Sequence, residues 1–542
     1  MKKIFISFAT FVAASVLMSG CSNDESTATT TNNNDQLTAF TGGIVTEVPM
    51  ERVQIGTPGG STVVPGITTR TSMNRGEIKG DGSFLWEPND VIYVEDDNNQ
   101  LCKGESTITD AVDRTTFLVY GSYTGKNQYD VYYCGTNSGV GEKKVVIADK
   151  QTQVAFNNTK HFGAAGDCGV ATATKATVAG KSGYRFDLEH KASYLCFLPY
   201  MALKVQRANF RIQRIEITSD NSIAGTYDLT QSGLSATGTN ESKTITLDVG
   251  TDGLKLADQA TATKSIKNSL YVVIAPGTHA LKVKYTVSDA KNTVMTITKS
   301  YKSHNFGVNK ICDIPVNLGV RHYSGHNYYM WDAAENYWSG HEWDTAVPWQ
   351  PTAEEESNAG YPKSKAADAS RWYHEGEAPF EASVNPLFKQ LPNANEMAWY
   401  ALKGDAYWDN TTWWEVFGSI HTGGIWLKKL SVIAQENGKK LAALKLKDPN
   451  GKDVDITYGF YEISPTNGKP SDSEIGKYFF LPALGHYGSG KLGSVGSDGF
   501  YWSSSSIDPD FSNHAAYLRF FSGLVYLSHH PRYYGFVAQP FE

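Results

Sequence analysis

The sequence predicts a multidomain protein in which two all-β sandwiches are followed by a third domain of mixed α+β structure. Short runs of alternating apolar and polar residues, separated by Gly, Asn and Asp, recur through residues 38–320. This is the pattern of half-buried antiparallel strands. The composition then changes, because eleven of the twelve Trp lie after residue 330 and the last Cys is Cys312. A boundary near residues 319–323 therefore separates two kinds of domain.

The N-terminus predicts export and a lipid anchor. Lys2 and Lys3 precede an apolar run over residues 4–18, which is the length of a signal-peptide core rather than of a membrane span. The run ends at Met18-Ser19-Gly20-Cys21, which resembles a lipobox. We expect residues 1–21 to be a lipoprotein signal peptide with Cys21 acylated, anchoring the chain to the outer membrane. An ordinary signal peptide with a chance Cys is the alternative.

Residues 22–37 are polar and have little apolar surface to bury, so they are expected to form a disordered tether. The acidic pair Asp24-Glu25 resembles the export signal of surface lipoproteins. The net charge of −7 and the pI of about 6.0 are not typical of nucleic-acid-binding proteins, which usually carry a basic surface.

The first sandwich is expected over residues 38–185 and the second over 186–320. Residues 281–287, Leu-Lys-Val-Lys-Tyr-Thr-Val, alternate with a period of two and predict a strand with one solvated face. Five Cys remain besides Cys21, and none forms a Cys-x-x-Cys pair. We expect mostly buried thiols, with a disulfide as the less favoured alternative, and neither a metal site nor a cofactor.

Several segments of this half resemble fimbrillin-like proteins. They are, in order, residues 69–72, 82–86, 90–94, 186–192, 223–229, 273–278 and 305–310. The resemblance implies two transthyretin-like sandwiches, export as a lipoprotein, and assembly with other pilus subunits by strand donation. It also implies proteolytic processing after an Arg, for which Arg52, Arg70 and Arg75 are candidates. Ordinary surface arginines are the alternative for each of them.

Residues 321–542 carry a second resemblance. The segments 481–485, 496–505, 516–520 and 534–537 resemble the C-terminal half of C-type-lectin-like domains of the FISUMP type. Trp502 and Leu481 would then be core residues. Asn393 with Glu396 predicts a capped helix, and the apolar spacing over 425–437 predicts an amphipathic one. Because the C-terminus belongs to this domain, a terminal position in a pilus is favoured over a stalk role.

Ligand binding is expected in the C-terminal domain, because its aromatic residues lie in Gly-rich segments that join strands. The lectin-like resemblance points first to Tyr487, His514, His529 and Tyr533, and then to Trp413 and Trp414. Further candidates for exposed aromatic platforms are Trp331, Trp338 and Trp343. The family's calcium-binding motifs are absent here: Glu87-Pro88-Asn89 lies in the wrong domain, and Trp408-Asp409-Asn410 has the wrong order.

We do not expect an enzyme. The oxidase branch of the same fold needs Cys, and no Cys follows Cys312. The residues 503–506, all Ser, lack a Gly-x-Ser-x-Gly elbow. Three hypotheses remain: a tip or accessory pilus adhesin, a non-polymerised surface lipoprotein that binds a host or bacterial glycan or protein, and, least favoured, a glycan hydrolase.

Overall fold

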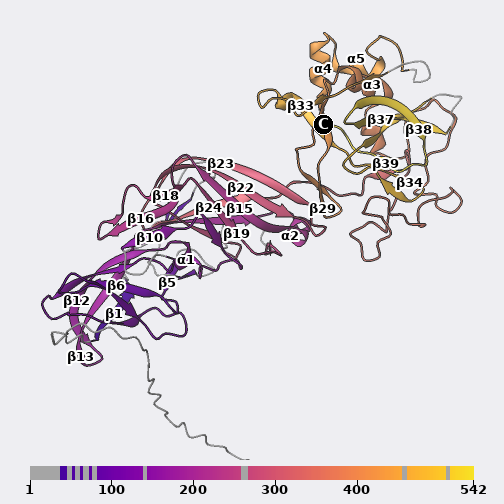
Figure 1. The fold of residues 1–542 in the computed structure, drawn as a ribbon. Helices are drawn as coiled ribbons and strands as arrows, with labels where there is room; N and C mark the ends of the chain where they lie inside the picture. The colour runs from indigo at the N-terminus through magenta and orange to yellow at the C-terminus, as the bar shows by residue number, and fades with distance from the viewer. Residues whose placement is uncertain are drawn as a thin grey trace, which may run out of the picture.

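The computed structural model describes residues 37–44, 52–54, 62–64, 72–75, 82–137, 143–257, 267–454, 461–507 and 513–542. The predicted signal peptide, the acylation site Cys21, nearly all of the tether and Arg70 lie outside these residues. Figure 1 shows three successive parts: an N-terminal β-barrel, a β-sandwich and a C-terminal domain that holds the longer helices. The mostly β, multi-sheet architecture that the sequence predicted is confirmed.

The first part is a barrel rather than the expected two-sheet sandwich. Its strands are β1 (Thr38–Ile44), β6 (Val91–Glu95), β7 (Leu101–Glu105), β8 (Thr115–Val119), β9 (Gln128–Tyr133), β12 (Gly169–Val178) and β13 (Lys181–His190). The sheet closes because β1 pairs in parallel with β13 and antiparallel with β8. Closure leaves no open edge in this ring. Phe40, Trp86 and Phe117 are fully buried inside it, and β4 (Ser72–Arg75) and β5 (Gly82–Leu85) form a separate hairpin.

The second part is a sandwich of two facing sheets. One contains β11 (Lys150–Thr152), β15 (Arg211–Ser219), β19 (Thr244–Asp248), β20 (Leu254–Lys255), β22 (Gly277–Ser288) and β23 (Val294–Phe306). The other contains β2 (Arg52–Gln54), β3 (Thr62–Val64), β14 (Ser193–Tyr200), β21 (Leu270–Ile274) and β24 (Ile311–Asn317). Phe197 of one sheet packs edge-on against Tyr285 of the other at 5.9 Å. The alternation predicted over 281–287 is confirmed, since Leu281, Val283, Tyr285 and Val287 are buried.

A small sheet of β10 (Lys144–Ile147), β16 (Ala224–Thr230), β17 (Gly233–Leu234) and β18 (Thr239–Ser242) flanks the sandwich, with helices α1 (Phe162–Ala165) and α2 (Lys204–Asn209). The predicted boundary at 185/186 falls inside β13, which belongs to the barrel. Conversely, β2, β10 and β11 come from the first predicted domain but pair with strands of the second. The chain therefore crosses between the two parts several times.

The described cysteines form no disulfide with one another. Cys134, Cys168, Cys196 and Cys312 are buried, and Cys102 is partly exposed. Burial raises the pKa of the Cys134 thiol to about 12. The expectation of mostly buried thiols is confirmed for these five residues.

The C-terminal domain is built on a mixed sheet. In spatial order its strands are β26 (Tyr328–Tyr329), β39 (Phe536–Val537), β36 (Gly499–Ser506), β37 (His514–Phe521), β38 (Leu524–Pro531) and β31 (Glu462–Ile463). A second sheet contains β32 (Thr466–Asn467), β27 (Tyr407–Trp408), β30 (Gly424–Lys428) and β33 (Tyr478–Pro482). Trp502 and Leu481 are buried as predicted. Smaller pairings join β25 (Arg321–Tyr323), β28 (Trp414–Val416) and β29 (Ser419–His421), and also β34 (His486–Gly488) and β35 (Lys491–Gly493).

The described residues of this domain form three α-helices, α3 (Ala394–Lys403), α4 (Leu430–Glu436) and α5 (Leu441–Leu446), and the 3-10 turns η1 (Phe388–Gln390) and η2 (Ile475–Lys477). The predicted cap of α3 is confirmed. The Asn393 side chain accepts a hydrogen bond from the Glu396 amide at 3.0 Å, and the Asn393 amide donates to the Glu396 carboxylate at 2.9 Å. The helix predicted over 425–437 is confirmed only in its second part. Residues 424–428 form β30, which pairs with β33, and α4 begins at Leu430.

Candidate functional site

The structure separates the six predicted ligand residues. Trp413 and Trp414 lie at the joint between the C-terminal domain and the second sandwich. Trp414 is fully buried, and its indole Nε1 donates to the Gly423 carbonyl at 3.0 Å. Trp413 packs on the sandwich core. Trp414 is buried in the core of the C-terminal domain and so cannot form an exposed platform, whereas Trp413 stays partly exposed.

The joint is held by the hairpin of β28 and β29. The Ile420 amide donates to the Asp289 carboxylate at 2.9 Å, and the Ile420 side chain is buried in the sandwich core. The hairpin lies against α2, since a Cβ on Gly418 would be 2.7 Å from Asn209 Nδ2; Figure 1 shows β29 beside α2. A pocket of about 580 Å³ lies beside this contact, lined in part by Lys291 and Trp413.

Tyr487, His514 and His529 do not line a described pocket. Tyr487 is fully buried, so it cannot stack on a ligand in this structure. His514 and His529 are partly buried on neighbouring strands, with their Nδ1 atoms 2.7 Å apart. Of the further candidates, Trp331 and Trp338 are also buried core residues, whereas Trp343 stays partly exposed.

Besides Trp413, Tyr533 is a predicted ligand residue that lines a pocket. We call this site the aromatic pocket; it has a volume of about 260 Å³. Its lining residues are Met330, Tyr337, Tyr361, Pro362, Lys363, Trp372, Ser489 and Tyr533. Met330 and Tyr337 are buried and form its base, while Tyr361, Trp372 and Tyr533 remain solvent-accessible. Three accessible rings around one small cavity form a surface on which a flat apolar face can stack.

The ring of Tyr361 in the aromatic pocket packs on buried tyrosine rings. Tyr361 stacks on Tyr337 with an interplanar angle of 6°, and Tyr337 stacks on Tyr487 with an angle of 16°. Tyr487 thus supports the pocket without touching its contents. Gly490, at φ +78°, permits the close approach, because a Cβ there would lie 2.5 Å from Tyr361 Cδ1 and 2.2 Å from the Asn358 carbonyl oxygen.

Two guanidinium groups, one partly buried and one fully buried, clamp the segments that carry the pocket. Arg371, next to Trp372, donates to the carbonyls of Tyr337 at 3.0 Å and Gly360 at 3.2 Å. Arg532, next to Tyr533, is fully buried and donates to the carbonyls of His374 and Gly376, both at 3.2 Å. These bonds tie the Trp372 segment to those of Tyr361 and Tyr533. The pocket is therefore formed before any ligand arrives.

Arg532 is an unusual buried cation. Its guanidinium lies 4.7 Å from the ring centroid of Phe380 and 5.1 Å from that of Trp331. Burial lowers its pKa to about 10, which still leaves it charged at neutral pH. Carbonyl oxygens and aromatic faces replace its water shell, so we assign it a positioning role.

Asp332 organises the irregular segment that carries Trp372. This carboxylate is fully buried and accepts hydrogen bonds from the amides of Ser383, Val384 and Asn385 at 2.8–3.0 Å. It also contacts His374 Nδ1 at 2.8 Å. A single side chain thus replaces the hydrogen bonds that regular secondary structure would otherwise supply.

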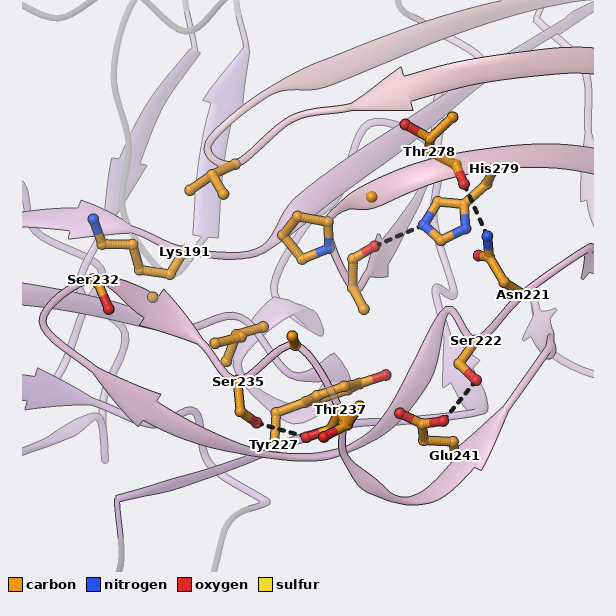
Figure 2. A pocket seen from close by; sticks show the side chains of 17 residues that line it. Lys191, Asn221, Ser222, Tyr227, Ser232, Ser235, Thr237, Glu241, Thr278 and His279 are labelled. Carbon is orange, nitrogen blue, oxygen red and sulfur yellow. Dashed lines mark hydrogen bonds between the residues drawn. The ribbon is translucent and has the colours of Figure 1, made fainter.

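Another pocket, of about 430 Å³, lies in the second sandwich. We call it the larger pocket because its volume exceeds that of the aromatic pocket. Figure 2 shows Lys191 and Ser232 at one end and Asn221, Glu241 and His279 at the other. Its polar groups bond mainly to one another: Asn221 Nδ2 donates to the Thr278 carbonyl at 2.9 Å, and Ser222 Oγ donates to Glu241 at 2.9 Å.

His279 in this larger pocket is buried, and burial lowers its pKa. Both of its ring nitrogens have partners, Ser219 Oγ and the Ala275 carbonyl oxygen, each at 3.3 Å. Because these polar groups already bond within the protein, the larger pocket is a weaker candidate for a ligand-binding site than the aromatic pocket.

Sequence reasoning missed Tyr361, Lys363 and Trp372. They lie in the stretch that matched the lectin-like resemblance poorly, so the resemblance assigned them no role. The signal that could have found them is Trp372-Tyr373-His374, an aromatic run in a polar segment without strand or helix periodicity.

Among the described residues, no group of three or more His, Cys, Asp or Glu side chains is arranged to hold a metal ion. In the same part of the chain, no helix is both long and apolar enough to cross a membrane.

Comparisons with known proteins were made for the sequence and for the fold. No family model matches the chain, and no curated protein matches it. A candidate cell adhesion protein from Bacteroides ovatus is 14% identical with a TM-score of 0.28, covering 50% of this chain and 92% of its own. A second, from Bacteroides uniformis, is 15% identical with a TM-score of 0.24, covering 43% and 88%.

A fimbrial protein from Bacteroides ovatus is 10% identical with a TM-score of 0.22, and the match covers 93% of this chain and 98% of that protein. Because all three TM-scores are low, the function has to be argued from the site itself.

Proposed function

We propose that this chain is a surface-exposed lipoprotein adhesin, a tip or accessory pilus subunit whose lectin-like C-terminal domain binds a ligand in the aromatic pocket. The ligand is a glycan or protein on a host or bacterial surface. The observation that carries the proposal is the preformed cavity of about 260 Å³ with three accessible aromatic rings. A rigid aromatic site binds at low entropic cost, which suits recognition rather than turnover.

Residues 541 and 542 pack onto their own domain. Phe541 is buried, and the Glu542 carboxylate accepts a hydrogen bond from the Tyr400 hydroxyl at 2.8 Å. The tip or accessory position in a pilus stays part of the proposal. A non-polymerised surface lipoprotein stays the alternative, and electron microscopy of extracted filaments distinguishes the two.

Proteolytic processing is part of the pilus proposal. Arg52 lies in β2, opposite Ile311 of β24, and Arg75 is the last residue of β4. Cleavage after Arg52 would need β2 to leave the sheet, because a protease binds its substrate in an extended, unpaired form. Arg75 pairs with Gly82 of β5, so cleavage after Arg75 would likewise need β4 to leave its hairpin.

The binding site is tested by removing its rings. Trp372→Ala and Tyr533→Ala should each weaken binding to a panel of immobilised glycans by about 1–3 kcal/mol, because each removes a stacking surface. Melting temperature should change little, since both side chains are partly exposed. Tyr120→Ala, which removes an aromatic side chain 61% exposed on the barrel, is the matched control and should leave binding unchanged. Unaltered binding by both pocket variants would refute the site.

The lipid anchor is tested separately. Metabolic labelling with a fatty-acid probe should mark the wild-type protein and not Cys21→Ala, since the thiol is the acylated atom. Cys102→Ala, which removes a partly exposed thiol from the barrel, is the control and should retain the label. Equal labelling of wild type and Cys21→Ala would remove the anchor from the proposal.

A further inference from the structure

The aromatic pocket carries a single charge. Among the described residues that line it, Lys363 alone is ionisable at neutral pH, since the others are Met, Tyr, Pro, Trp and Ser. The Lys363 ammonium lies 5.3 Å from the centroid of the Tyr361 ring, so the cation is held at the pocket wall.

The carboxylates on the neighbouring segments are already engaged. Glu375 accepts from Trp372 Nε1 at 3.0 Å and pairs with Lys365 at 3.2 Å. Asp368 pairs with Arg371 at 2.5 Å. These two acids and two bases pair with one another, which leaves Lys363 as the cation presented to a ligand.

The larger pocket of Figure 2 shows the contrast. Its Lys191 is paired with Glu189 at 2.7 Å, and Glu241 accepts from Ser222 Oγ and from the Gly238 amide at 2.8 Å. The charges of that pocket are thus satisfied inside the protein, whereas Lys363 has no ion pair with a described residue.

The geometry points to an acidic sugar residue, one that bears a carboxylate on a saturated ring, as the group that the aromatic pocket binds. This inference rests on the proposed function and assigns its ligand class. The C–H face of the sugar stacks on Trp372 or Tyr533, and the carboxylate accepts from the Lys363 ammonium. A cavity of about 260 Å³ admits one such ring. An acidic peptide side chain satisfies the ammonium but offers no face to the three aromatic rings, so the sugar is favoured.

The test uses the purified full chain and an array of paired acidic and neutral sugars. The pairs are glucuronic acid with glucose, galacturonic acid with galactose, and sialylated with desialylated oligosaccharides, together with acidic peptides. At low ionic strength, at least one acidic sugar should bind about fivefold more tightly than its neutral partner, and added salt should reduce the difference.

Variants separate the charge from the rings. Lys363→Gln should abolish the preference for the acid, while Lys363→Arg should retain it. Lys365→Gln, which removes a neighbouring ammonium already paired with Glu375, is the control and should also retain it. Trp372→Ala should weaken binding to both members of a pair.

Each outcome is decisive. Equal binding of the paired sugars, or a preference that survives Lys363→Gln, overturns the ligand class but leaves the proposed function intact if Trp372→Ala still lowers binding. Binding to acidic peptides alone overturns the sugar assignment. Binding to no sugar or peptide, or binding that is indifferent to Trp372→Ala, overturns the proposed function as well.

Discussion

Replacing Asp332 by Ala should lower the unfolding free energy of the C-terminal domain by about 3–5 kcal/mol. The buried carboxylate accepts hydrogen bonds from three backbone amides, those of residues 383–385, and contacts His374. Ala leaves these donors without partners in a site that excludes water, and each orphaned buried donor costs about 1–3 kcal/mol. Asp332 also has φ +52°, a conformation that Ala tolerates less well than Asp or Asn.

Denaturant unfolding followed by Trp fluorescence measures this effect, because eleven of the twelve Trp belong to the C-terminal domain. Asp332→Asn separates the two causes, since Asn accommodates the backbone angle but lacks a second acceptor oxygen. Asp344→Ala is the control: its side chain is 48% exposed and pairs with the exposed His326, so its loss should cost less than about 1 kcal/mol. Equal losses for Asp332→Ala and Asp344→Ala would contradict the organising role of Asp332.

Lowering the pH from 7 to 5.5 should cost the C-terminal domain about 3 kcal/mol through three buried imidazoles, an effect opposed by His322, whose pKa is raised by its hydrogen bond to Glu415. Burial lowers the pKa of His421, His486 and His530 to about 4 in the folded state. An unfolded His has a pKa near 6.5. Above pH 6.5 both states are neutral and the full stability is present. As the pH falls from 6.5 towards 4, only the unfolded state takes up protons, so stability is lost by about 1 kcal/mol per His at pH 5.5.

The measurement is the unfolding free energy at pH 7, 6.2 and 5.5, a window above the ordinary pKa of carboxylates. His530→Gln should reduce the pH dependence by about one third, because one of the three proton-binding groups is removed. Stability that stays constant from pH 7 to 5.5 would show that these imidazoles do not stay neutral in the fold.

Some features of this protein follow from local sequence alone. The period of two over residues 281–287 determines which side chains of β22 face the sandwich core, because successive residues of a strand point to opposite faces. Asn393 and Glu396 likewise specify the start of α3, since a capping box needs only four consecutive residues. The change in Trp and Cys content near residue 320 also marks the start of the C-terminal domain, because the cores of the two halves contain different residue types.

Burial of individual aromatic residues could not be predicted in this way. Trp413 and Trp414 stand in a polar, Gly-rich segment that suggests exposure, yet Trp414 is buried in the core of the C-terminal domain and Trp413 packs partly buried against the sandwich core. Tyr487 has similar surroundings in the sequence and is covered by Tyr337. Exposure depends on which distant segment packs over a ring, and local composition does not specify that segment.

The sequence by itself determined the β-rich architecture, the place of the C-terminal domain and the capped start of α3. Only the tertiary structure decided the barrel closure, the exchange of β2, β10 and β11 between the first two parts, and the aromatic pocket. The physical reason is the range of the interactions. Strand periodicity and helix capping act over a few residues, whereas the pocket joins Tyr361, Trp372 and Tyr533 across more than 160 positions of chain. Only the packing of Arg371, Arg532 and Gly490 brings those rings together.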